Sequence, residues 1–392
     1  MKLRNIALTG LLAMSFCILG GCGSSSNSTQ TEPQPQSQPQ PQPDPPTLAE
    51  SLQVLLDNTV GEDVPGVLLH VEGPEIDFTG AAGLSDIETQ SPMQIYHQMP
   101  VGSAGKKATA LLVAMLHEEG LLNIDDLISE YLPASILSNI QYSDQMTIRQ
   151  LLNHTAGVHD YLDSDTAGEW FAYGIETVGQ LKTDINALEF IYNKPAYFEP
   201  GTGVQYSNSG YLLAGLILDE ILGEHHSVEL RNRVLIPLGL NDTYYGGIEN
   251  ELGTSISGYI LEDGQMENTK PFFESVGVAD APLVTTASDL SKLLREIMTD
   301  DTVITEEIRE LLIGEASMVE TNYGFDFGLG LFEDNILGQQ VYHHGGAEVG
   351  YETRNLYFVD DDITVTLFSN CHGYTACDEK TEILIQQVLA KL

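Results

Sequence analysis

Positive charge is scarce in this sequence of 392 residues. Lys and Arg together number 16, against 57 Asp and Glu, and the formal net charge is −41. A chain this acidic repels the phosphates of nucleic acids and the headgroups of anionic lipids. We therefore expect neither nucleic acid nor a bare anionic membrane as a partner. The composition is typical of a protein with a solvated acidic surface.

Long hydrophobic runs are also scarce, and the one at the start has the form of a targeting segment. Residues 1–21 combine the basic start MKLRN with the apolar stretch IALTGLLAMSFCILG, which is too short for a stable membrane span. The stretch ends in LGGC, which resembles a bacterial lipobox with Cys22 as the lipidated residue. The resemblance predicts a lipid anchor in the cell envelope, on the outer membrane facing the periplasm where a cell has one. An ordinary secretory signal cut nearby is the alternative.

The next segment, residues 22–46, lacks the apolar residues that a core needs. It consists mainly of Ser, Gln and Pro, which predicts an extended, disordered, lipid-anchored linker. The remaining residues, 47–392, are numerous enough for a large domain with its own core. We therefore predict three parts, namely a signal peptide, a linker and one globular domain.

Cysteine is rare, and only Cys371 and Cys377 belong to the predicted domain. An oxidising compartment permits a disulfide between them, but the sequence leaves open whether they pair. His372 lies between them, and this spacing matches no zinc pattern. We predict no metal site and no cofactor.

Strand patterns occur at both ends of the predicted domain. GVLLHVEG and IDFTGAAG near its start, and TRNLYFVD and DDITVTLFSN near its end, are typical of strands, and a helix pattern runs from about 375 to 392. Helix patterns dominate the region from about 124 to 275. This order predicts an α+β fold, with an antiparallel sheet flanked by helices and an inserted helical subdomain.

The segment GSAGKKATALLVAMLHEEG places Ser103 three residues before Lys106 at the start of a predicted helix. Residues at this spacing share a helix face, one turn apart. A serine hydroxyl becomes a nucleophile when a base removes its proton, and burial at a positive helix terminus lowers the pKa of a lysine toward that role. We predict Ser103 as the nucleophile and Lys106 as its base. We expect Lys107 to be a solvated charge.

Two further motifs follow in order along the chain. One is Y-S-N at 206–208, just before a helix, and the other is H-G-G at 344–346, ahead of a strand. With the Ser103–Lys106 pair they resemble the serine β-lactamase and penicillin-binding protein family over residues 48–392. The resemblance points to the branch that holds class C β-lactamases, D-alanyl-D-alanine carboxypeptidases and related esterases.

The resemblance also implies roles for individual side chains. Tyr206 would carry a proton to the leaving group, and Asn208 would hydrogen-bond the amide side of the substrate. His344 stands where many relatives have Lys, and as a cation it would steady a substrate carboxylate. His154 would be structural, in a loop that packs under the site. The pair His225 and His226 is expected to be solvated.

The glycines and the backbone around them complete the implied site. Gly345 and Gly346 would keep the strand edge free of side chains for the substrate. The oxyanion hole would be the N–H groups of Ser103 and Ala347. We expect acyl transfer through a Ser103 ester, first of all D-alanyl-D-alanine carboxypeptidase-like hydrolysis of small peptides. Esterase or β-lactamase activity is the alternative, and a non-catalytic envelope binding module is a third reading. The sequence gives no oligomeric state.

Overall fold

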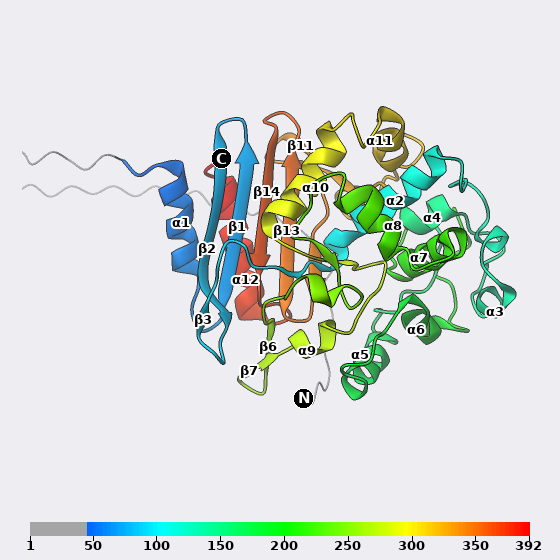
Figure 1. Cartoon of the computed structure of the whole chain (residues 1–392), viewed down its shortest axis with the longest axis horizontal. Coiled ribbons are helices and arrows are strands. Elements are labelled where there is room, and N and C mark those ends of the chain that lie inside the picture. The colour runs from blue at the N-terminus through cyan, green and yellow to red at the C-terminus, as the bar shows by residue number, and fades with distance from the viewer. Residues whose placement is uncertain (1–44) are drawn as a thin grey trace, which may run out of the picture.

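The computed structural model describes residues 45–392. The predicted signal peptide, Cys22 and nearly all of the predicted linker lie outside the described residues. Figure 1 shows a large sheet with helices on its faces and a mainly helical region beside it. Within residues 45–392, no helix is long and apolar enough to cross a membrane.

The domain begins with a helix and strands, continues with a mainly helical region that also contains short strands, and ends with strands and a helix. The α-helices are α1 (Leu48–Thr59), α2 (Lys106–Glu118), α3 (Ala134–Leu137), α4 (Ile148–Leu152), α5 (Ala167–Glu176), α6 (Asp184–Leu188), α7 (Ser209–Leu222), α8 (Ser227–Leu230), α9 (Lys270–Phe273), α10 (Ala287–Thr299), α11 (Glu306–Ile313) and α12 (Thr375–Leu389). The strands are β1 (Gly66–Gly73), β2 (Ile76–Asp86), β3 (Ser91–Pro92), β4 (Met99–Pro100), β5 (Tyr244–Tyr245), β6 (Tyr259–Glu262), β7 (Gln265–Asn268), β8 (Leu283–Thr285), β9 (Asp326–Phe327), β10 (Phe332–Ile336), β11 (Gln339–His343), β12 (Gly346–Glu348), β13 (Tyr351–Phe358) and β14 (Ile363–Ser369).

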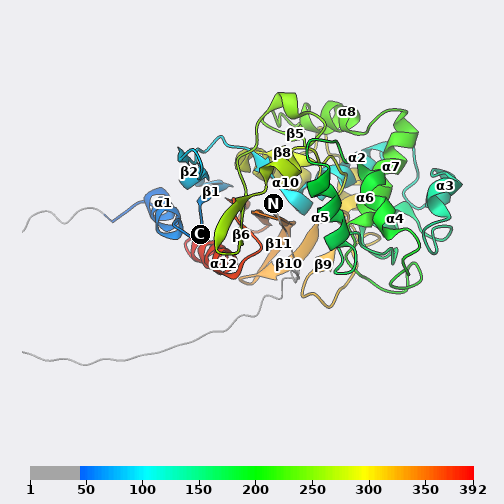
Figure 2. The ribbon, with the colours of Figure 1, turned by 90° about the horizontal axis from the view of Figure 1, so that it is seen from below.

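The main sheet has the strand order β3-β2-β1-β14-β13-β11-β10-β9, and β12 pairs with β13. The central pairing joins β1, near the start of the domain, to β14, near its end, in antiparallel register, with Leu69 opposite Leu367. Figure 2 shows the first and last helices, α1 and α12, side by side. The predicted α+β fold, with both ends of the domain in one antiparallel sheet, is confirmed.

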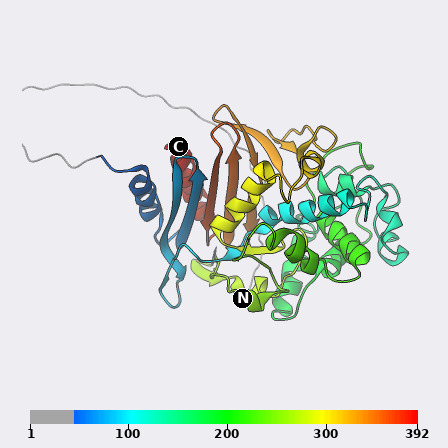
Figure 3. The same cartoon turned by 45° about the horizontal axis from the view of Figure 1, so that its top comes forward.

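Alternating side chains of β1 fill two separate cores. Val67, Leu69 and Val71 pack with α1 and α12 on one face, whereas Leu68 joins the larger core on the other face. Figure 3 shows α10 lying across that second face. The alternation follows from the two-residue period of a strand. Both faces of the sheet are therefore buried, and the helical region extends the larger core.

The domain begins at a well-defined helix start. The Glu50 N–H donates to Thr47 Oγ1 at 3.2 Å, and the Glu50 carboxylate accepts from the Thr47 N–H at 2.8 Å. This reciprocal capping box satisfies backbone donors that the first turn of α1 leaves free. At the other end of the domain, Cys371 and Cys377 form a disulfide between the end of β14 and α12. The question that the sequence left open is thereby answered.

Candidate active site

The turn that carries Ser103, the predicted nucleophile, differs from the predicted helix. Ser103 lies in the short 3-10 helix η1 (Gly102–Gly105), and the α-helix α2 begins only at Lys106. Gly102 has a φ of +53°, a value that glycine adopts without strain. A Cβ atom at this position would lie 3.2 Å from the Ala347 N atom. The tight turn therefore places Ser103 next to β12 while keeping it one turn from Lys106.

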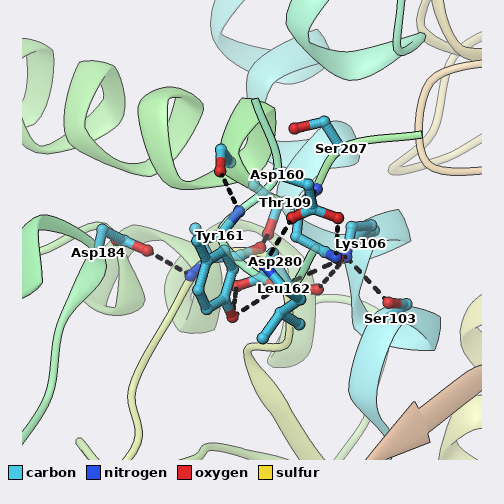
Figure 4. Close-up of polar contacts among 12 residues, drawn as sticks. Ser103, Lys106, Thr109, Asp160, Tyr161, Leu162, Asp184, Ser207 and Asp280 are labelled. Carbon is cyan, nitrogen blue, oxygen red and sulfur yellow. Dashed lines mark hydrogen bonds and ion pairs between the residues drawn. The ribbon is translucent and has the colours of Figure 1, made fainter. Parts of the chain in front are cut away.

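The amine of Lys106 has three polar neighbours. Its Nζ lies 3.0 Å from Ser103 Oγ, 2.7 Å from Asn208 Oδ1 and 2.8 Å from the Asp280 carbonyl oxygen. Figure 4 shows this amine pointing toward Ser103 on one side and Asp280 on the other. The amide and carbonyl oxygens accept hydrogen bonds but cannot donate them, whereas a serine hydroxyl can do both. A neutral amine fits these three neighbours. Its two N–H groups can donate to the amide and carbonyl oxygens, and its lone pair can accept the Ser103 proton.

Burial favours the neutral form of Lys106. The side chain is fully buried, and the loss of solvent lowers its pKa below the ordinary value. The carboxylate of Asp280, 3.7 Å from Nζ, and the charge of Asp160 oppose this shift without cancelling it. The predicted pairing of a serine with a desolvated lysine is present in the structure.

Asn208 is held at both ends of its amide. Its Oδ1 accepts from Lys106, and its Nδ2 donates to Asp160 Oδ2 at 3.0 Å. Burial raises the pKa of Asp160 to about 6. These contacts fix the position of the Lys106 amine. A contact between Asn208 and substrate stays a prediction.

Tyr206 lies over the amine of Lys106. Its ring centroid is 5.3 Å from Lys106 Nζ and 4.3 Å from the ring of His154. Burial raises the pKa of Tyr206 well above its ordinary value, against a smaller lowering by the nearby Ser103 hydroxyl. The buried Tyr206 hydroxyl makes no well-aligned hydrogen bond among the described residues. His154 Nδ1 accepts from the Ser207 N–H at 3.2 Å, which supports the structural role expected for this histidine.

His344 does not carry the positive charge that its predicted role as a carboxylate anchor needs. The side chain is 2% exposed, its Nδ1 lies 2.7 Å from the Gly345 carbonyl oxygen, and its ring stacks on Phe332. Burial lowers the pKa of His344 well below its ordinary value, and the charges of Lys107 and Lys106 act in the same direction. The imidazole is therefore neutral near pH 7, and it cannot serve as a cation there.

The two glycines of this motif lie close to neighbouring backbone. A Cβ atom at Gly346 would lie 2.0 Å from the Val101 carbonyl oxygen and 3.0 Å from the Ser103 N atom. At Gly345 it would lie 2.8 Å from the Thr353 carbonyl oxygen. Contacts with the protein's own backbone therefore exclude side chains at both positions, and a role in leaving space for substrate stays a prediction. The close approach of β12 to η1 also brings Ala347 beside the nucleophile turn.

Lys107 is also buried, which contradicts the expectation of a solvated charge. Its side chain is 0% exposed, because α2 is covered along both its sides, and its Nζ donates to the His344 carbonyl oxygen at 3.3 Å. Burial lowers the pKa of Lys107 to about 7. Two adjacent lysines of this cation-poor chain therefore lie in its interior.

His226 was also expected to be solvated, and it is not. The ring is 1% exposed and lies 2.8 Å from both Asp219 Oδ1 and the Tyr245 hydroxyl. Asp219, His225 and His226 form one of three groups of His, Asp and Glu side chains in residues 45–392 whose ligand atoms lie close enough for a metal ion.

The sequence motifs missed several groups of the site. Asp160, Asp280 and Glu348 surround Lys106, and the Tyr161 hydroxyl donates to Asp280 Oδ2 at 3.2 Å. Burial raises the pKa of each of these three carboxyl groups. No spacing marks them in a chain with 57 acidic residues, because only the fold distinguishes a buried carboxyl group from a solvated one.

This fold and this constellation define a class of protein, the serine hydrolases of the β-lactamase and penicillin-binding protein type. A family model described as Beta-lactamase matches residues 53–390. The chain belongs to this family.

Two relatives are similar to this chain at low sequence identity. Penicillin-binding protein 4* of Bacillus subtilis (strain 168) is 26% identical over 341 residues, which cover 81% of this chain and 71% of that protein. Protein flp of Staphylococcus aureus (strain N315) is 23% identical over 254 residues, or 63% of this chain. The chain matches about half of flp, 49% of its length.

Solved structures share the fold. The D-amino acid amidase of Ochrobactrum anthropi SV3, complexed with L-phenylalanine amide, aligns with a TM-score of 0.73 and 22% identity, covering 88% of this chain and 98% of the amidase. The octameric penicillin-binding protein homologue of Pyrococcus abyssi aligns with a TM-score of 0.71 and 25% identity, covering 87% of this chain and 77% of the homologue. These likenesses establish the architecture of the chain.

Proposed function

We propose that the chain hydrolyses small amides or esters through a covalent ester on Ser103. The observation that carries this proposal is the set of neighbours around Lys106. Two acceptors and one hydroxyl surround a buried amine, an arrangement that fits a neutral amine acting as general base.

In the proposed reaction, Lys106 removes the Ser103 proton as Oγ attacks the substrate carbonyl carbon. The oxyanion of the tetrahedral intermediate would be stabilised by the N–H groups of Ser103 and Ala347. The leaving group departs with a proton, which passes from Lys106 by way of Tyr206. A water molecule then attacks the Ser103 ester, releases the acid and restores the hydroxyl.

Hydrolysis of D-alanyl-D-alanine peptides is a second candidate, favoured by the likeness to a penicillin-binding protein of Bacillus subtilis. That substrate ends in a carboxylate, and the neutral His344 gives it no cationic partner. The first candidate therefore fits the site better, and β-lactam hydrolysis remains an activity to be tested beside it.

We also propose that the domain is held at the cell envelope by a lipid on Cys22. The LGGC sequence at the end of the apolar start supports this proposal. Metabolic labelling with a lipid precursor tests it. The native chain should incorporate label, and a Cys22→Ala chain should not. Equal labelling of both chains would contradict a lipid at Cys22.

Covalent labelling tests the proposed chemistry. A fluorescent alkyl phosphonate should label the wild type, and Ser103→Ala should remove the label. Lys106→Ala should slow both labelling and ester hydrolysis by about 10²- to 10⁴-fold, because the base is lost. Lys391→Ala, a change of an exposed lysine, is the matched control.

The wild type should also cleave at least one of three chromogenic substrates, an amino acid nitroanilide, a nitrophenyl ester or a cephalosporin. A folded wild type that takes no label and cleaves none of them would establish a binding module instead.

A further inference from the structure

The side chain of Glu348 lies on the face of β12 that meets the nucleophile turn. Side chains alternate along a strand, so Gly346 and Glu348 share a face and Ala347 points the other way. The Gly346 side of this strand contacts the Ser103 backbone. The Glu348 Cγ atom lies 3.2 Å from where a Cβ atom of Gly102 would be. Both neighbours of Ala347 therefore face η1.

The Glu348 carboxyl group has no hydrogen-bond or ion-pair partner among residues 45–392. The residue is mostly enclosed by protein but still reaches solvent. Burial raises the pKa of Glu348 to about 8, the charge of Asp280 adds to this rise, and Lys106 opposes it. Carboxyl groups that lose most of their contact with water are normally paired. Because Glu348 has no protein partner and still reaches solvent, its carboxyl group is able to bind a ligand.

The charge around the nucleophile favours a cationic partner. Asp160, Asp280 and Glu348 all act on Lys106, which must be neutral to serve as a base. Asp160 accepts a hydrogen bond from Asn208, and Asp280 accepts one from Tyr161. Of the three carboxyl groups, Glu348 is the one without a protein donor.

The position of Glu348 next to Ala347 determines which part of a substrate it would meet. In the proposed reaction the Ala347 N–H binds the oxygen of the reacting carbonyl. A group on the carbon next to that carbonyl would lie within reach of the following side chain. In an amino acid amide or ester with a free amine, this group is the α-ammonium.

We propose that Glu348 binds the free α-ammonium group of the substrate and thereby selects amino acid amides and esters whose amine is unblocked. This inference rests on the proposed acylation of Ser103 and names its substrate class. A salt link between the two groups would supply the partner that the Glu348 carboxyl lacks. The link forms on binding, since a cation beside a carboxyl group favours the ionised form.

A pair of substrates that differ only at the amine provides the test. D-Alanine 4-nitroanilide carries a free amine, and N-acetyl-D-alanine 4-nitroanilide does not. In the wild type, kcat/KM should be about 10- to 100-fold higher for the free amine, the range expected of a hydrogen bond between charged groups. The L-forms, measured in parallel, show whether the preference depends on configuration.

Glu348→Gln should bring the ratio of kcat/KM for the free amine to kcat/KM for the acetylated substrate close to one. The variant should lose kcat/KM for the free amine mainly through a higher KM. Glu348→Asp keeps the charge on a shorter side chain and should retain part of the preference. Glu320→Gln, a change of an exposed glutamate in the same domain, should leave the ratio as in the wild type. A Glu348→Gln protein that keeps the full preference would overturn the inference, and so would a wild type that prefers the acetylated substrate.

A measurement on the wild type alone tests the same inference without depending on whether the variants fold. D-Alaninamide should protect Ser103 from the fluorescent phosphonate at lower concentrations than N-acetyl-D-alaninamide does. Equal protection, or labelled protein that cleaves neither anilide, would contradict the role of Glu348 and leave Ser103 acylation intact. Failure of the wild type to take any label would instead contradict the proposed function itself.

Discussion

The amine of Lys107 lies 3.3 Å from the main-chain carbonyl oxygen of His344. This contact joins α2, which carries the proposed base, to the segment that leads into β12. Both side chains are buried, so the hydrogen bond forms away from water. Lys107 therefore contacts the backbone just before Ala347, the proposed oxyanion donor.

Replacing Lys107 should change how stability depends on pH. An unfolded lysine has a pKa of about 10.4, whereas burial lowers that of Lys107 to about 7. Between these values the folded protein binds fewer protons than the unfolded chain. The free energy of unfolding should therefore rise as pH increases from 7 to 10, by on the order of 4 kcal/mol from this group.

Lys107→Met removes the titrating amine and keeps an apolar chain of similar length. Urea unfolding at pH 7, 8 and 9 measures the free energy of unfolding. Its rise with pH should be markedly smaller in the variant than in the wild type. Lys391→Met, at an exposed position, should keep the wild-type rise. The same slope in the Lys107 and Lys391 variants would show that the interior amine does not titrate in this range.

Removing the charge of Asp280 should move the acidic limb of the pH profile of kcat/KM to lower pH. The Asp280 carboxylate, 3.7 Å from Lys106 Nζ, raises the pKa of that lysine against the effect of burial. Asp280→Asn leaves the backbone carbonyl that accepts from Lys106 and removes the charge. Lys106 should then become neutral at lower pH.

The measurement is kcat/KM against pH for a neutral nitrophenyl ester. The acidic limb should lie at lower pH in Asp280→Asn than in the wild type and in Asp144→Asn, which changes an exposed carboxylate. An acidic limb displaced toward higher pH would indicate that Asp280 assists the reaction as a carboxylate.

Local sequence patterns predicted several of the residues that lie together at this site. Three short motifs located Ser103, Lys106 and Tyr206, because spacing along one helix turn and the order of motifs are properties of the chain itself. The strands at both ends of the domain were predicted for the same reason, since alternation and turn residues are local signals. Their pairing in one sheet then followed from the order of elements.

Burial could not be predicted in the same way. Lys107 and His344 look like ordinary polar residues in the sequence, and their charge states depend on how α2 and β11 pack. The partnerless carboxyl group of Glu348 depends on the approach of β12 to η1, which joins segments about 245 residues apart in the sequence. Electrostatic roles at this site are therefore tertiary properties.

Reduction of the Cys371–Cys377 disulfide should lower stability moderately. The bond closes a short loop between β14 and α12, and the loop entropy that it removes from the unfolded chain corresponds to about 2 kcal/mol. A strong reductant should lower the Tm of the wild type by a few degrees. A Cys371→Ala/Cys377→Ala protein should have a lower Tm that does not respond to reductant. A wild-type Tm that is unchanged after complete reduction, confirmed by thiol titration, would contradict this contribution.

Salt should stabilise the folded protein, because its charges are so unequal. The formal net charge of −41 makes like charges repel within the compact domain more strongly than in the extended chain. The screening length falls from about 10 Å at 0.1 M to about 3 Å at 1 M salt. We expect Tm to rise by several degrees across that range of sodium chloride at pH 7.5. The same scan near pH 4.5 is the control, because many carboxylates are protonated there and the gain should shrink. A flat or falling Tm at pH 7.5 would mean that local pairing, such as that of Arg231 with Glu249, already balances the repulsion.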